Sequence, residues 1–233
     1  MNLAQLTGQD ETVLVNYDGY LLHADVVTDW AALQRDAAQA GFDLAIASAY
    51  RSFSRQLLIW NEKASGVRPL FDDKGQLLSV EQMSETDVVF AILRWSALPG
   101  GSRHHWGTDI DVYDRSAIAQ NYAVQLNEIE VQSGGVFAPL HNWLDARIDK
   151  QQSYGFFRPY TTLTSTQETR PTGIAAERWH LSHQPSAEQF SQQLTLSALY
   201  QVIDAQEDMQ LKATVLAHFD EIFTTFISAS AIG

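Results

Sequence analysis

Two imidazoles and two carboxylates lie close together between residues 102 and 111, where the sequence is Ser-Arg-His-His-Trp-Gly-Thr-Asp-Ile-Asp. Residues 108–113 alternate as a strand does, so Asp109 and Asp111 are predicted to share one face. A turn at Gly107 can bring the imidazole of His104 back beside Asp111. Such a cluster can bind a metal ion, although an ordinary hydrogen bond explains a single His–Asp pair equally well.

A second cluster follows at residues 177–180, Glu-Arg-Trp-His. In an extended stretch Glu177 and His180 would point to opposite sides, but a turn or bulge would let both reach one centre. Two histidines and one aspartate, His104, His180 and Asp111, are suitable ligands for a tetrahedral zinc ion with one position left for water. Glu177 would then lie where a general base could take a proton from that water.

The third segment covers residues 48–56, Ser-Ala-Tyr-Arg-Ser-Phe-Ser-Arg-Gln, at a predicted junction between a strand and a helix. An arginine at such a junction, here Arg51, can hold a fixed cation beside a developing oxyanion. By itself, Tyr50-Arg51 is also compatible with a surface salt bridge. The three segments in this order are far more specific than any one of them.

Together the three segments resemble the zinc D-alanyl-D-alanine peptidases, which include the VanY-type carboxypeptidases and the VanX-type dipeptidases. The family patterns are S-x-H-x-x-G-x-A-x-D, then E-x-W-H, preceded by a G-Y-R-S-type segment with a glutamine shortly after. The matching residues are Ser102, His104, Gly107 and Asp111, then Glu177, Trp179 and His180, and before them Tyr50, Arg51, Ser52 and Gln56. The match covers roughly residues 20–183.

The resemblance implies a zinc enzyme that hydrolyses a peptide bond to a C-terminal D-amino acid, as a D-alanyl-D-alanine carboxypeptidase does with peptidoglycan-type peptides. It also implies a role for each matched residue: zinc ligands His104, Asp111 and His180, the base Glu177, the oxyanion-stabilising Arg51, and the peptide-binding Ser102 and Gln56.

Three alternative functions remain open on sequence grounds. A D,D-dipeptidase and an L-alanyl-D-glutamate endopeptidase share this site and differ in the surrounding loops. The alternative that is not an enzyme is a zinc-stabilised binding module that has lost catalysis. The presence of Glu177 and Arg51 argues against the module, because a structural zinc site needs neither residue.

Asp109 departs from the family pattern, because the family usually has alanine there. Its carboxylate could orient a ligand histidine, bind a substrate amine, or weaken the preference for a free acid; support of a ligand is favoured. His105 and His183 flank ligand positions, and they are expected to support the site or lie at the surface rather than coordinate. Three histidines outside the motifs are expected to be structural: His23, His141 and His218.

Composition limits the partners. The net charge of −13, with only 15 Lys and Arg, argues against nucleic acid as a partner and disfavours docking on anionic membranes. The absence of cysteine excludes disulfides and thiolate ligands. No apolar run reaches membrane-spanning length, and no secretory signal is visible. We therefore expect a cytoplasmic protein. Its substrates would then be precursor or recycled muropeptides. The sequence does not predict the oligomeric state.

The predicted elements mix helices and short strands without βαβ regularity, which favours an α+β fold. We predict one small-sheet catalytic domain over residues 1–183 and a helical extension over residues 184–233. The elements expected are a hairpin at 13–27, strands at 43–49, 108–113 and from 156, a loop at 68–78, a polar loop at 161–173, and helices at 29–40, 54–64, 84–98, 140–151 and, in two segments, after 186.

Two local expectations concern the ends of these elements. Thr28-Asp29 and Ser84 are predicted to cap the helices that follow them. The apolar face of the tail, which includes Phe219, Ile222 and Phe226, is expected to pack on its own chain, with a dimer interface as the alternative.

Overall fold

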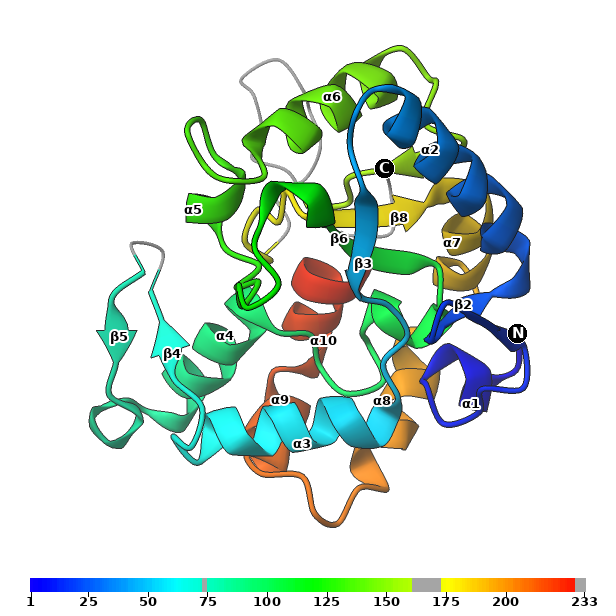
Figure 1. The fold of residues 1–233 in the computed structure, drawn as a ribbon. Helices are drawn as coiled ribbons and strands as arrows, with labels where there is room; N and C mark the ends of the chain where they lie inside the picture. The colour runs from blue at the N-terminus through cyan, green and yellow to red at the C-terminus, as the bar shows by residue number, and fades with distance from the viewer. Residues whose placement is uncertain (73–74, 161–172, 229–233) are drawn as a thin grey trace.

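A four-stranded antiparallel sheet carries two of the three candidate ligands on its neighbouring strands. The computed structural model describes residues 1–72, 75–160 and 173–228. The strand order is β3 (Leu44–Ser48), β6 (Asp109–Asp114), β8 (His180–His183) and β7 (Phe156–Phe157). In this register Asp111 of β6 lies directly opposite His180 of β8. Figure 1 labels β3, β6 and β8 of this sheet.

The two faces of this sheet have different compositions. Ile110 and Val112 of β6 are fully buried in an apolar cluster with helices α2 (Val27–Gln39) and α6 (Ala138–Asp149). Because side chains alternate along a strand, Asp109 and Asp111 point to the other face, as predicted. The sheet therefore presents its carboxylates away from the α2–α6 layer.

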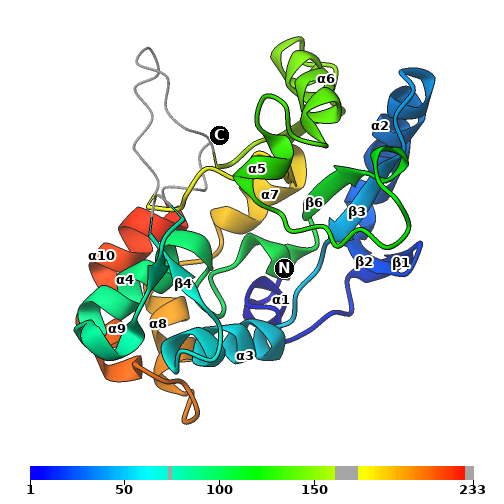
Figure 2. The ribbon, with the colours of Figure 1, turned by 60° about the vertical axis from the view of Figure 1, so that its left-hand side comes forward.

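A second apolar cluster is built from helices. It joins α3 (Phe53–Ala64) and α4 (Glu85–Trp95) to the helices that follow the sheet. Those helices are α7 (Gln184–Ser191), α8 (Leu196–Asp204), α9 (Lys212–Ala217), α10 (Phe219–Ile222) and a π-helix at Phe223–Ser228. Figure 2 shows α4, α8, α9 and α10 together on one side, away from α2 and α6.

The remaining elements of the described chain are short. The helices are α1 (Leu3–Leu6) and α5 (Glu128–Val131), the hairpin strands are β1 (Leu14–Tyr17) with β2 (Tyr20–His23) and β4 (Leu70–Phe71) with β5 (Leu77–Leu78), and the 3-10 helices are Ala24–Val26, Val80–Gln82, Arg103–Trp106 and Arg115–Ala117. Within the part of the chain that is described, no helix is both long and apolar enough to span a bilayer.

The structure confirms the α+β class and corrects several details. Residues 68–78 were predicted as a loop, but β4 and β5 form a small hairpin there. The predicted Thr28-Asp29 cap is wrong, because α2 already begins at Val27 and its N-cap residue is Val26. Ser84 does cap α4, although that helix ends at Trp95 rather than at residue 98. The predicted polar loop at 161–173 lies almost wholly outside the described residues.

The apolar face of the tail packs on its own chain, as expected. Phe219, Ile222 and Phe226 are buried in the helical cluster with Trp60 of α3 and Ile92 of α4. The two predicted tail helices are in fact α7 to α10 and the π-helix. The division of the chain into domains at residue 183 stays a prediction.

Candidate metal centre

The three candidate ligands come together from separate segments. Asp111 lies in β6, His180 is the first residue of β8, and His104 lies in the 3-10 helix Arg103–Trp106. Gly107 ends that helix with φ 68°. A Cβ atom there would lie only 2.8 Å from the backbone nitrogen of His23, so glycine is required for the turn that returns His104 to the sheet.

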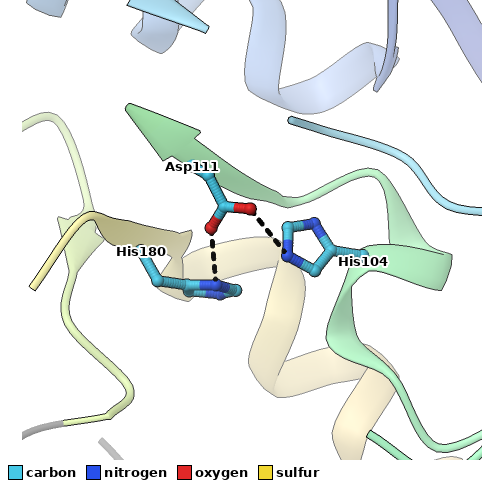
Figure 3. Close-up of side chains that lie close together, drawn as sticks. All are labelled: His104, Asp111 and His180. Carbon is cyan, nitrogen blue, oxygen red and sulfur yellow. Dashed lines mark ion pairs between the residues drawn. The ribbon is translucent and has the colours of Figure 1, made fainter. Parts of the chain in front are cut away.

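The Asp111 carboxylate lies between the two imidazoles (Figure 3). One oxygen is 3.4 Å from Nε2 of His104, and the other is 3.1 Å from Nδ1 of His180. The ligand atoms of the three residues all lie within 4.8 Å of one another, and all three residues are buried. They form a compact, water-shielded group of two nitrogens and one carboxylate.

The unused atoms of this group suit a metal ion. Oδ1 of Asp111 and Nδ1 of His180 are buried 3.1 Å apart as an ion pair, but among the described residues neither has a hydrogen-bond partner of good geometry. Buried polar atoms rarely lack partners, so two in one place indicate a missing ligand. Two imidazole nitrogens and a carboxylate oxygen are a donor set typical of zinc. The residues present therefore fit a zinc ion.

In His104 and His180, the ring nitrogen that points away from the other ligands makes a hydrogen bond. That hydrogen bond fixes the tautomer of each ring. Nδ1 of His104 donates to the carbonyl oxygen of Ala49 at 2.7 Å. Nε2 of His180 donates to Oδ1 of Asp109 at 2.9 Å. In each ring the nitrogen that faces the centre is thus left unprotonated for coordination when a metal is bound.

Asp109 contacts a candidate ligand, which is the supporting position favoured from the sequence. Its buried carboxylate also accepts hydrogen bonds from Nε of Arg103 at 2.9 Å and Oγ1 of Thr108 at 2.6 Å. Burial alone would raise the pKa of Asp109, but the Arg103 charge and the hydrogen bonds hold it well below its usual range. Asp109 is therefore an anion that orients His180.

Replacing Asp109 with asparagine is expected to weaken zinc affinity by about 10–100-fold, because the supporting charge on His180 is lost. Competition with a chromophoric chelator measures the affinity. Asp43→Asn is a matched control, since Asp43 pairs with Arg115 at the surface. Equal zinc affinity in Asp109→Asn and the wild type would contradict the orienting role.

Glu177 lies beside the centre because the chain turns just before β8. The backbone nitrogen of His180 donates to the Glu177 carbonyl at 3.0 Å, which closes the turn. Oε2 of Glu177 is then 3.7 Å from Nδ1 of His180, on the side where the unused ligand atoms lie. Burial raises the pKa of Glu177 to about 7. A carboxylate with a pKa near neutrality is well suited to accept and return a proton.

Arg51 is fixed against the segment that carries His104. Its backbone nitrogen donates to the carbonyl of His104 at 3.1 Å, and its carbonyl accepts from Nδ1 of His105 at 2.6 Å. Its side chain donates from Nη1 to Oε1 of Gln56 at 3.0 Å. The Gln56 amide is fully buried and also donates to the carbonyl of Ala97 at 2.7 Å. Gln56 thus holds the Arg51 guanidinium, and its contact with a peptide stays a prediction.

Ser102 and two residues outside the motifs complete the surroundings. Ser102 is buried directly before the 3-10 helix, and its peptide-binding role stays a prediction. The Tyr160 ring lies 4.9 Å from the ring of His180 in an edge contact. Lys63 of α3 interacts electrostatically with Glu177. Sequence reasoning missed both, although Lys63 shares a helical face with Gln56, seven residues earlier, and could have been found that way.

The other histidines do not take part in the metal-binding group found among the described residues. His105 is buried and its Nε2 accepts from the backbone nitrogen of Gly100 at 3.0 Å. His183 joins α7 to α2, because its Nε2 lies 3.0 Å from Oδ2 of Asp29. The remaining three pack within the fold, as expected of structural residues: His23 against Phe190, His141 against Arg158 and His218 against Phe90.

Comparisons with known proteins show which family this chain resembles. The family model of VanY, D-alanyl-D-alanine carboxypeptidase, matches residues 19–186. An uncharacterised protein of Haemophilus influenzae is 43% identical over 98 residues, which cover 40% of this chain and 67% of that protein.

Two solved structures share the fold. VanYB in complex with D-alanine-D-alanine has a TM-score of 0.51 at 19% identity, over 83% of this chain and 89% of that one. The LdcB LD-carboxypeptidase has a TM-score of 0.50 at 19% identity, over 92% of this chain and 78% of that one. Since the VanY model spans the sheet and all three motifs, the chain belongs to the VanY family of peptidases.

Proposed function

We propose that this protein is a zinc-dependent D-alanyl-D-alanine carboxypeptidase that acts on peptidoglycan-type peptides. The observation that carries the proposal is the buried group of His104, Asp111 and His180, with unpartnered ligand atoms and the Glu177 carboxylate beside them. Membership of the VanY family supports the same substrate class.

Each residue has a role that follows from its position. His104, Asp111 and His180 would hold the zinc ion, which when bound supplies a Lewis acid that polarises the scissile carbonyl and makes water easier to deprotonate. Glu177 accepts the proton of the attacking water and returns it to the departing amine. The Arg51 guanidinium stabilises the negative charge that develops on the carbonyl oxygen.

Gln56 acts through Arg51 in this proposal. Its amide is hydrogen-bonded both to Arg51 and to the backbone at Ala97, so it fixes the direction of the guanidinium. A cation that is already in position costs no reorganisation as charge develops. A structural zinc site would need neither this cation nor the free carboxylate of Glu177, which argues against a binding module.

A small panel of peptides tests the proposed reaction. It contains D-Ala-D-Ala, a pentapeptide ending in D-Ala-D-Ala, a tetrapeptide with an L-centre before its terminal D-Ala, and an L-Ala-D-Glu peptide. We expect release of D-Ala from the pentapeptide. Cleavage of the free dipeptide alone would identify a D,D-dipeptidase, and cleavage of L-Ala-D-Glu alone an endopeptidase. Preference for the tetrapeptide would identify an L,D-carboxypeptidase.

The purified protein is expected to bind about one zinc ion per chain, because two histidines and one aspartate form a single catalytic-type site. His104→Ala and His180→Ala should each lose the zinc, as measured by elemental analysis after dialysis. His218→Ala is the matched control, since His218 lies outside the metal-binding group. Full zinc occupancy after either ligand substitution would refute the assignment of that ligand.

A further inference from the structure

A pocket beside the metal centre carries charge of the sign opposite to that of the whole protein. The pocket has a volume of about 580 Å³, and the described residues that line it include three arginines, Arg51, Arg55 and Arg68, and one acid, Glu11. In the whole chain the ratio is reversed, with 28 Asp and Glu against 15 Lys and Arg. The pocket therefore attracts anionic groups of a ligand, although the protein as a whole repels them.

One wall of the pocket is the end of β3, which is also fixed to the metal-binding group. Ser48 lines the pocket and lies opposite Asp111 in the register of β3 and β6. The carbonyl oxygen of the next residue, Ala49, accepts the hydrogen bond from Nδ1 of His104 at 2.7 Å. Two residues later, the backbone nitrogen of Arg51 donates to the carbonyl of His104 at 3.1 Å. The pocket and the metal centre thus share one short segment of backbone, so a peptide bound at the centre can extend into the pocket.

The lining and the size of the pocket indicate which part of the peptide enters it. Arg51, which stabilises the oxyanion in the proposed reaction, lines the pocket, whereas Glu177, which serves the departing amine, does not. The volume of the pocket is in the range of sites that enclose ligands much larger than one amino acid. The departing D-alanine is a single small residue and needs little of this space. The acyl part of the peptide, which continues beyond the polarised carbonyl, therefore enters the pocket.

The three arginines of the pocket differ in what already holds them. Arg68 is paired with Glu62, and Nη1 of Arg51 donates to Gln56. The Arg55 side chain is exposed and makes no ion pair with any residue that the structure describes. Arg55 is thus the arginine that an incoming anion can engage without breaking a contact seen in the described part of the chain.

Apolar residues accompany these cations. Ile59 lies four residues after Arg55 on α3, and both line the pocket. Residues four apart are neighbours on one face of a helix. Leu21 of β2 also lines the pocket. A side chain with an aliphatic stem and a carboxylate at its end would therefore find partners for both of its parts.

We propose, on the basis of the proposed carboxypeptidase function, that this pocket binds an acidic side chain on the acyl part of the peptide, with Arg55 as the residue that contacts its carboxylate. The enzyme then prefers peptides that carry an acid before the D-Ala-D-Ala pair over neutral peptides of the same length. The acidic residue lies either directly before this pair or one position earlier.

Two pairs of acetylated peptides and the zinc-loaded enzyme test the proposal. The first pair is acetyl-Glu-D-Ala-D-Ala and acetyl-Gln-D-Ala-D-Ala, and the second has one L-Ala inserted after the Glu or Gln. A carboxylate bound by an exposed arginine is worth about 5–10-fold, so the wild type should prefer the glutamate member of a pair by that factor in kcat/KM, mainly through KM. The pair that shows the preference identifies the position. Added salt should reduce the preference, because it screens exposed charges.

Substitutions of the two unpaired charges at the pocket should act in opposite directions. Arg55→Gln should abolish the preference for glutamate and leave kcat/KM for the glutamine peptides unchanged, while Arg55→Lys should keep part of the preference. Glu11→Gln should increase the preference, because it removes an acid that repels the carboxylate of the peptide. Arg35→Gln is the matched control and should keep the wild-type preference, since Arg35 is exposed on α2 and does not line the pocket.

Three outcomes would overturn the proposal. Equal kcat/KM for the glutamate and glutamine members of both pairs would show that the pocket binds no acidic side chain. A preference that persists in Arg55→Gln would exclude Arg55 as its cause. If Arg55→Gln slows all four peptides equally, it acts on a group that they share, and the assignment to the acyl part is wrong. The C-terminal carboxamides of the same peptides would show whether that group is the terminal carboxylate.

A binding measurement separates this proposal from the proposed reaction. Calorimetry with zinc-loaded Glu177→Ala, with and without Arg55→Gln, gives the affinity for the four peptides in the absence of turnover. Tighter, Arg55-dependent binding of a glutamate peptide supports the pocket even if the wild type releases no D-Ala, which would refute the carboxypeptidase function alone. Release of D-Ala by the wild type together with equal affinity for glutamate and glutamine peptides would refute the pocket alone.

Discussion

Replacing Glu177 with alanine is expected to lower turnover by about 10²–10⁴-fold, the usual contribution of a general acid–base group. The zinc content should stay nearly unchanged, because His104, Asp111 and His180 already provide three ligands. The fold should also persist, since removal of a buried carboxylate whose pKa is raised to about 7 relieves a desolvation cost. Release of D-Ala and elemental analysis measure the two effects.

Glu177→Gln serves as the sharper variant, because the amide keeps the shape of the side chain but cannot accept the proton. It should be impaired as strongly as Glu177→Ala. Glu221→Gln is the control, since Glu221 is exposed on α10. Near-normal turnover in Glu177→Gln would exclude Glu177 as the base even if zinc binds as expected.

A chain ending at Gln184 is expected to lose cooperative thermal unfolding, because it lacks the apolar side chains that complete the helical cluster. The residues removed include Leu199, Val215, Phe219 and Ile222, all buried in the same cluster as residues of α3 and α4. Without them the inner faces of those two helices would be exposed to water. Circular dichroism during heating gives the unfolding curve, and zinc binding shows whether the sheet survives.

A graded version of this test uses single substitutions. Ile222→Ala should cost about 2–5 kcal/mol in urea denaturation, because it leaves a cavity at a fully buried position. The neighbouring Glu221→Ala, at an exposed position, should change stability by less than about 0.5 kcal/mol. Cooperative unfolding and zinc binding in the chain ending at Gln184 would instead show that residues 1–183 fold alone, as the sequence-based division predicts.

The ligand-bearing elements could be predicted from the sequence because their signals are local. Alternation around Ile110 places Asp109 and Asp111 on one face, and Gly107 marks the turn that His104 requires. The turn before His180 was also expected, and the structure shows it. Each of these features depends on a few consecutive residues, so it can be predicted without knowledge of the rest of the fold.

The features that were missed depend on contacts between distant segments. Asp29 was taken as a helix cap, but its carboxylate lies against His183, which is 154 residues away in the chain. The β4–β5 hairpin has only two residues in each strand, too few for a pattern of alternation. Tyr160 was also missed, because its contact with the ring of His180 joins residues 20 positions apart in the chain.

The two separate apolar clusters have a consequence for how such a protein can diversify. The ligands on β6 and β8 are supported by the sheet cluster, whereas Gln56 and Lys63 are carried by α3, which packs in the helical cluster. Mutational effects on groups that share no partners are usually additive. Substitutions on α3 away from Gln56 are therefore expected to leave the ligand geometry of β6 and β8 unchanged, so the two halves of the molecule can be altered separately.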